Sequence, residues 1–239
     1  MANGIYAAAA GMAAQQTRMD AIANDLANVN TSGYKTQQVA FADLLYGSED
    51  GVDVGGGAKA IGLGPEMQQG SLAPSDNPVA FGINGPGFIQ VRTADGNLAL
   101  TRNGDLQIDA KGALVTADGS KLVPPIAIPA GLTASDVTIS TNGTVSAAGK
   151  ALGQIKIVNV PAPSGLLAAG SSNYLTTPAS GAAIPAAGST FEQGTLESSN
   201  VDVAKAMSSL LDAQNNYSLL SHAINTQDQL LQMANQLRA

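Results

Sequence analysis

The chain has 239 residues, 44% hydrophobic content and a formal net charge of −7, so it can bury the cores of one or two domains. It contains no cysteine, which excludes disulfides, catalytic thiolates and cysteine-ligated metal sites. The lysines and arginines form no cluster, so neither a nucleic-acid-binding surface nor an anionic-membrane-binding surface is expected.

Residues 1–46 are predicted to form a long helix and the motif by which the chain leaves it. Apolar positions recur every seven residues with a companion row three residues later, as in a coiled coil. This N-terminal seam consists of Ile5, Met12, Met19, Ile22 and Val29. Asn3 is the predicted N-cap, and Gly33 can take the left-handed backbone that follows a helix. The helix should cover about 26 residues, or about 39 Å.

The start of this helix is not expected to be a membrane span or a cleaved signal. The apolar run 5–14 is too short to cross a bilayer. No basic residue precedes it, and the helical pattern continues past it. A route out of the cytoplasm would therefore have to leave the N-terminus uncleaved.

Residues 47–77 are glycine-rich and weakly patterned, and they are predicted to be an extended connector. Residues 78–190 are predicted to form a β-rich domain. The expected strands are 79–83, 88–93, 98–102, 106–109, 113–116, 137–140, 144–147, 154–160 and 173–176. Asp-Gly or Asn-Gly pairs at 95–96, 103–104, 118–119 and 142–143 predict tight hairpin turns.

Residues 191–239 are predicted to enter and form a second long helix, of about 37 residues or about 55 Å. Ser199 with Asp202 reads as a capping box. The C-terminal seam consists of Val203, Leu210, Tyr217, Leu220, Ile224 and Leu231. The predicted fold class is therefore α+β, with long N- and C-terminal helices that form a coiled-coil stem and an inserted all-β domain of short strands.

No constellation typical of catalysis is present. His222 is the single histidine, so a multi-histidine metal site is excluded, and it falls on the C-terminal helix off the seam. The Gly-x-Gly at 85–87 precedes a strand pattern rather than a helix, which argues against a dinucleotide site. The aspartates of 95–118 lack EF-hand spacing and are expected in turns. We expect no enzyme, no cofactor, no metal and no small-molecule substrate.

Six segments resemble the signature of bacterial flagellar rod and hook proteins. The most specific is ANDLANVNTSGYK at 23–35, with rod-like sequence around it at 11–20 and 41–46. The others are FGINGPGF at 81–88 with TRNGD at 101–105, and QGTLESSNVD at 193–202. Segments 15–20 and 44–46 most resemble the distal rod type, and a proximal rod or hook-type axial protein is the alternative.

The first signature segment supplies the residues of an axial assembly motif. The motif comprises Asn24, Leu26, Ala27, Asn28, Asn30, Thr31, Gly33 and Tyr34. Near a helix end, asparagines can hydrogen-bond exposed backbone groups, while Ala27 allows close helix approach. Gly33 permits a sharp exit toward the β region.

The resemblance implies a structural subunit of the basal-body rod, the drive shaft that carries motor torque to the hook. The terminal helices of many copies would form an inner tube, with the β domain outside it. The implied partners are further copies of the chain, neighbouring rod and hook proteins, the flagellar type III export apparatus and the bushing rings around the rod. The implied location is extracytoplasmic, where the rod crosses the periplasm or cell wall.

An alternative of another class is a secreted cell-wall-binding β domain with oligomerising helices. The low aromatic content of 4% argues against it, because sugar-binding platforms usually need exposed rings. We further expect that removal of residues 1–35 abolishes assembly but leaves the β domain folded.

Overall fold

The computed structural model describes residues 2–44, 47–49, 52–186 and 188–238, and the chain divides into two compact units. Unit 1 comprises Met1–Ala27, Gln37–Leu63 and Asp202–Ala239. Unit 2 comprises Asn28–Thr36 and Gly64–Val201. The helical ends thus share a unit with part of the predicted connector, and the β-rich middle shares one with the segment that follows the first helix.

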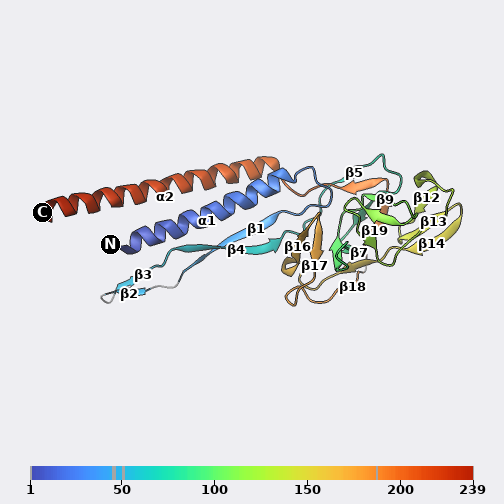
Figure 1. Ribbon diagram of the computed structural model, residues 1–239, viewed down its shortest axis with the longest axis horizontal. Coiled ribbons are helices and arrows are strands. Elements are labelled where there is room, and N and C mark those ends of the chain that lie inside the picture. The colour runs from blue at the N-terminus through green and yellow to red at the C-terminus, as the bar shows by residue number, and fades with distance from the viewer. Residues whose placement is uncertain (1, 45–46, 50–51, 187, 239) are drawn as a thin grey trace. The chain divides into compact units, whose positions relative to one another are not determined.

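Two long helices, α1 (Ala2–Ala27) and α2 (Val203–Arg238), pack side by side in unit 1 (Figure 1). Gly4 lies against Gln227, and Gly11 lies against Leu220, so the helices run antiparallel. A Cβ atom at Gly11 would lie 3.2 Å from Cδ1 of Leu220, which shows how closely the helices approach there. The two helices and the strands between them agree with the predicted α+β class, while the coiled coil stays a prediction.

The ends of both helices differ in detail from the prediction. Because α1 ends at Ala27, Val29 lies beyond the helix rather than on its seam. The Thr31 hydroxyl donates to Oδ1 of Asn28 at 3.1 Å, and such local side-chain bonds favour a turn over a further helical turn. At α2 the N-cap is Asp202 itself, whose carboxylate accepts from the backbone N–H groups of residues 204 and 205. The predicted capping box with Ser199 as cap is therefore wrong.

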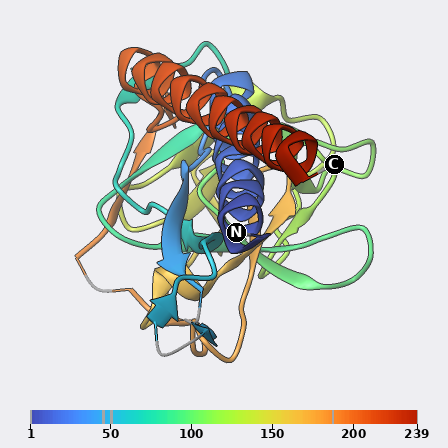
Figure 2. The same cartoon turned by 90° about the vertical axis from the view of Figure 1, so that its left-hand side faces the viewer.

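A β-ribbon formed by β1 (Gln37–Asp43) and β4 (Ala58–Pro65) completes unit 1. It runs along α1 on the side away from α2 (Figures 1 and 2). A Cβ atom at Gly57 would lie only 3.0 Å from Cα of Ala7, and the Arg18 guanidinium lies 5.9 Å from the centre of the Phe41 ring. The helix α1 is thus packed between α2 and the ribbon.

The stretch 47–77, predicted as an extended connector, contains strands. These are β2 (Gly47–Glu49), β3 (Val52–Val54), β4 and β5 (Leu72–Pro74). β2 pairs with β3, and β5 pairs with β20 (Thr195–Glu197), so part of the stretch is held by backbone hydrogen bonds. The pattern missed them because short strands rich in glycine carry little hydrophobic alternation.

The main sheet of unit 2 has the strand order β16–β17–β8–β7–β11–β10–β9. Its strands are β16 (Leu167–Gly170), β17 (Asn173–Leu175), β8 (Leu98–Thr101), β7 (Phe88–Arg92), β11 (Lys121–Leu122), β10 (Leu114–Thr116) and β9 (Leu106–Ile108). β15 (Ile157–Asn159) pairs with the first half of β7, and also with β18 (Ile184–Pro185). The strand pairings of this sheet, over the described residues, are antiparallel, so short hairpins can connect neighbouring strands.

Smaller sheets surround the main one. β12 (Val137–Ile139), β13 (Thr144–Ala147) and β14 (Lys150–Gln154) form a three-stranded sheet, and β6 (Phe81–Asn84) pairs with β19 (Thr190–Gln193). Each predicted strand overlaps an observed one, but 154–160 is divided between β14 and β15. The division follows from burial of Ile155, whose N–H bonds to Gly143 where the chain crosses between sheets.

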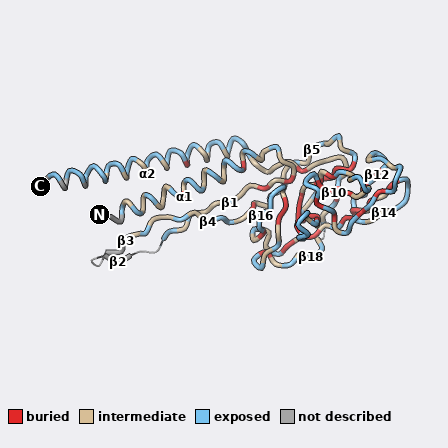
Figure 3. The backbone as a smooth tube through the Cα atoms, in the orientation of Figure 1, coloured by how far each residue is buried: buried red, intermediate tan, exposed pale blue. Residues whose placement is uncertain are grey.

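The hydrophobic core described by the structure lies in unit 2, where buried segments gather along the strands (Figure 3). Phe81 and Phe191 meet edge to face, with ring centres 5.1 Å apart, and so join β6 to the late strand β19. A second cluster contains Phe88 and Tyr174, whose ring centres are 6.2 Å apart. The late segment 190–197 therefore completes a core that mostly consists of earlier strands.

Three of the four predicted hairpin turns connect paired strands: 95–96, 118–119 and 142–143. The pair at 103–104 does not, because β8 pairs with β7 and β17 rather than with β9. The backbone of Gly104 instead accepts a hydrogen bond from the N–H of Phe81 at 3.1 Å. No room remains for a Cβ atom at Gly104, which explains a glycine there without a hairpin.

The Asp118 carboxylate stabilises the turn between β10 and β11 through hydrogen bonds, and this makes the stability of the turn depend on pH. Burial of its carboxyl raises the pKa, but hydrogen bonds from the Thr116 and Ser120 hydroxyls and the Asn173 amide outweigh this, and the pKa lies below 3.8. The carboxylate therefore stabilises the fold above the unfolded-state pKa, and this contribution is lost as the pH falls through the lowered folded-state value.

We expect Asp118→Ala to lower the free energy of unfolding by about 1 kcal/mol at pH 7, allowing for solvent exposure. The difference in melting temperature between wild type and variant should shrink between pH 5 and pH 2, measured by circular dichroism. Asp95→Ala, in the exposed β7–β8 turn, is the control. A difference that is the same at every pH would contradict the role given to the ionised carboxylate.

Candidate functional site

The structure divides the predicted axial assembly motif between the two units. Asn24, Leu26 and Ala27 form the last turn of α1, where Leu26 is half-buried and the other two are exposed. The remaining members, Asn28, Asn30, Thr31, Gly33 and Tyr34, belong to unit 2. Gly33 is buried with φ of +69°, a left-handed conformation that favours glycine. Its N–H donates to the backbone carbonyl of Glu197 at 2.8 Å, so the motif is bonded to the segment that leads into α2.

The predicted seams lie largely on the faces that α1 and α2 turn toward each other or toward the ribbon. In α1 the half-buried members are Ile5, Met12, Met19 and Ile22. In α2 they are Leu210, Tyr217, Leu220 and Ile224. Val203 is exposed, and the side chain of Leu231 lies outside the described part. Pairing within one chain thus accounts for these rows, and their contact with other copies stays a prediction.

A second apolar surface on α2, the outer stripe, was missed by the heptad analysis. It consists of Met207, Leu211, Leu219, Leu230 and Met233, which are between 51% and 66% exposed. Leu211 and Leu220 are nine residues apart, or two and a half helical turns, and so project from opposite sides of the helix. Since Leu220 faces Gly11 of α1, the outer stripe faces away from α1.

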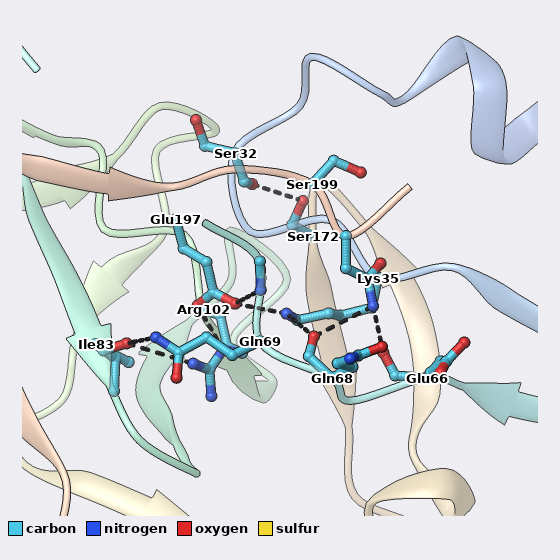
Figure 4. A network of polar contacts seen from close by, with 12 residues as sticks. Ser32, Lys35, Glu66, Gln68, Gln69, Ile83, Arg102, Ser172, Glu197 and Ser199 are labelled. Carbon is cyan, nitrogen blue, oxygen red and sulfur yellow. Dashed lines mark hydrogen bonds and ion pairs between the residues drawn. The ribbon is translucent and has the colours of Figure 1, made fainter. Parts of the chain in front are cut away.

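A buried ion cluster of Lys35, Arg102 and Glu197 lies inside unit 2 (Figure 4). Nζ of Lys35 lies 2.5 Å from Oε1 of Glu197, and Nε of Arg102 lies 2.7 Å from Oε2 of the same carboxylate. The side chains are 0%, 3% and 0% exposed for Lys35, Arg102 and Glu197. One carboxylate therefore binds two cations out of contact with water, and the three charged side chains together carry one excess positive charge.

Backbone groups satisfy the rest of the cluster. Lys35 donates to the carbonyl of Gln68 at 2.7 Å, and Gly70 donates its N–H to Oε1 of Glu197 at 3.0 Å. Arg102 donates to the carbonyls of residues 87 and 85 at 2.7 and 3.1 Å. The excess positive charge thus meets carbonyl oxygens, as a buried cation requires.

The cluster perturbs the ionisable groups around it. Burial lowers the pKa of Lys35 below 10.5, although the Glu197 carboxylate opposes this, and Arg102 lowers it further. Burial raises the pKa of the Tyr174 hydroxyl to about 12, while the backbone N–H of Lys35 opposes this shift. The tyrosine stays neutral, and the chemistry is that of a structural ion pair rather than of an acid and a base set for proton transfer.

The three segments that contain these residues were identified from the sequence, but it was not predicted that Lys35, Arg102 and Glu197 meet. Lys35 ends the signature at 23–35, Arg102 lies in TRNGD, and Glu197 lies in QGTLESSNVD. Lys35 and Glu197 are 162 residues apart, so only the fold brings them together. The expectation that the β domain tolerates loss of residues 1–35 is therefore not supported, because Lys35 belongs to the interior of unit 2.

Other kinds of site find little support in the described residues. Among them, no group of three or more His, Cys, Asp or Glu side chains could hold a metal ion. His222 is exposed on α2. Neither helix, over the portion that the structure covers, is long and apolar enough to cross a membrane.

Comparison with known proteins places three regions of the chain in flagellar families. Residues 5–35 match the family described as flagella basal body rod protein, 82–147 the D1 domain of flagellar hook protein FlgE/F/G, and 192–237 the C-terminal region of flagellar basal body rod FlgEFG protein. Similar proteins cover nearly the whole chain, and each of the following is named flagellar basal-body rod protein FlgG.

The relative from Caulobacter vibrioides is 38% identical over 97% of this chain and 98% of its own length. That from Buchnera aphidicola subsp. Schizaphis graminum is 36% identical, covering 95% and 96%. That from Bacillus subtilis is 34% identical, covering 97% of each.

If the charge balance of the ion cluster matters, the stability losses of two single variants should not add up in the double variant. Glu197→Gln leaves two cations buried together and should cost about 3–5 kcal/mol in the free energy of unfolding. Lys35→Met leaves a neutral Arg–Glu pair and should cost about 1–3 kcal/mol. The double variant should be at least about 1 kcal/mol more stable than Glu197→Gln alone, because one unpaired cation is gone.

Urea denaturation followed by near-ultraviolet circular dichroism measures these differences. Glu192→Gln, which removes an exposed carboxylate five residues earlier, is the matched control and should lie within about 0.5 kcal/mol of wild type. Additive losses in the double variant would count against the charge balance described for the cluster.

Proposed function

The chain belongs to the family of flagellar basal-body rod proteins, and we propose that it polymerises through unit 1 into the helical tube of the rod, which carries motor torque to the hook. Members of this family are structural subunits of the flagellum and assemble with other rod and hook components. The family is not a class of enzymes, and its membership favours an axial role over cell-wall binding. The observation that carries the proposal is the outer stripe of α2.

The outer stripe gives polymerisation a driving force. Its members are long apolar side chains, each more than half exposed in the single chain. Covering the exposed half of such a side chain is worth about 1 kcal/mol. Five of them along one helix can stabilise a contact with a second copy, provided that the copy presents a matching surface.

The length of α2 supports the same proposal. Gly4, near the start of α1, already lies against Gln227, so α2 continues beyond the first residues of α1. Leu230 and Met233 lie in this extension and are 56% and 51% exposed. Exposed apolar side chains at a helix end are well suited to pack on a neighbouring subunit.

A finer assignment rests on resemblance. We propose the distal part of the rod, since the relatives described above are named FlgG and segments 15–20 and 44–46 resemble the distal type. We further propose export by the flagellar type III apparatus without a cleaved signal, a position across the periplasm or cell wall, and contact with the bushing rings around the rod.

Leu211→Asp tests the outer stripe. A carboxylate in a packed apolar contact is costly, so the variant should remain folded but fail to form rods, with its critical concentration raised by at least roughly tenfold. Sedimentation of the purified protein and electron microscopy of isolated basal bodies measure this. Asn216→Asp adds the same charge at an exposed position off the stripe and should assemble normally. Normal rods with Leu211→Asp would remove the main support for the proposal.

A further inference from the structure

Three segments that border unit 1 in the sequence are bonded to one another inside unit 2. They are 33–36, 66–71 and 197–200. The chain passes between the units at 27/28, 36/37, 63/64 and 201/202, and the segments lie beside the last three of these passages. The ion cluster joins all three: Lys35 donates to the carbonyl of Gln68 and to Oε1 of Glu197, and the N–H of Gly70 donates to the same oxygen.

Asn200 adds a second set of bonds between the same segments. Its Oδ1 accepts from the N–H of Thr36 at 2.9 Å, and its amide donates to the carbonyls of Glu66 and Gln68 at 2.9 and 3.2 Å. The N–H of Glu66 also donates to the carbonyl of Thr36 at 2.8 Å. Each segment is thus held by the other two, and Glu197 is also the last residue of β20, which pairs with β5.

We infer that the ion cluster and Asn200 form a latch, which orders these three segments together and only when residue 197 is in place. Glu197 is the only anion of the cluster, and it accepts from groups on both other segments. Without its carboxylate, Lys35 and Arg102 would be two buried cations without a counter-ion, and burial of such charges is strongly unfavourable. The segment that carries Lys35 therefore has no stable place in unit 2 until Glu197 arrives.

The latch can close only late in folding of a chain that emerges N-terminus first, because Glu197 comes after its partners in the sequence. Lys35 and Arg102 precede Glu197 by 162 and 95 residues. In a chain that emerges N-terminus first, the passages at 36/37, 63/64 and 201/202 stay unordered until the residues up to 197 have emerged. The central strands β7 to β13 contain none of the three segments and can pair before then. This inference is tested on the single chain and does not depend on polymerisation.

Amide hydrogen exchange of the full chain, with Glu197→Gln against wild type, tests the latch. The reporter amides are those of Gly33, Glu66 and Ser198, one from each segment, and each donates to a backbone carbonyl. Their exchange should become at least roughly tenfold faster together. The amides of Leu114 and Ile155, bonded within the β region, should lose less protection than the three reporters.

Three results would overturn the inference. The first is faster exchange confined to the Gly70 amide, which bonds the carboxylate directly, and the second is unchanged exchange everywhere. The third is an equal loss at Leu114 and Ile155, which would mean that the whole unit opens. Lys35→Met should show the same pattern more weakly and replaces Glu197→Gln if that variant does not fold, while Glu192→Gln should match wild type.

Discussion

The structure of unit 2 depends on one carboxylate shared by two buried cations. Glu197 binds Lys35 and Arg102 at 2.5 and 2.7 Å, with almost no exposure to water. Buried ion pairs add little net stability when complete, but an incomplete one is costly. The cluster therefore adds little stability itself, but unit 2 is destabilised when the cluster is incomplete. It requires segments from the beginning, middle and end of the chain to be present together.

This condition explains why segments far apart in the sequence carry the family resemblance. Segments 23–35, 101–105 and 193–202 each contribute one charged residue to the cluster.

Unit 1 has to pack both within its own chain and against neighbouring copies in the proposed rod. Its helix α2 is apolar on the side of α1 and again along the outer stripe, as expected of a helix that packs on its own chain and on a neighbour.

The helices and most strands could be predicted from local pattern, since heptad spacing and Asp-Gly or Asn-Gly turns act over a few residues. The turn at 103–104 could not, because Gly104 is required by the close approach of Phe81, a contact between distant residues. The ion cluster could not be predicted either, because it also joins distant residues. A single lysine or glutamate in a polar segment is normally expected to be exposed to solvent. The outer stripe was not predicted, because a search for a seven-residue repeat finds apolar residues on only one side of a helix.

The most direct test of the central claim is nitrogen NMR of the lysine ammonium groups. The other lysines are exposed, whereas Lys35 is fully buried against Glu197. The Lys35 ammonium should therefore give a separate, slowly exchanging signal, and its pKa should lie below 10.5 because burial disfavours the charged form. A Lys35 signal that exchanges with water as fast as the others and titrates at the usual value would contradict the account.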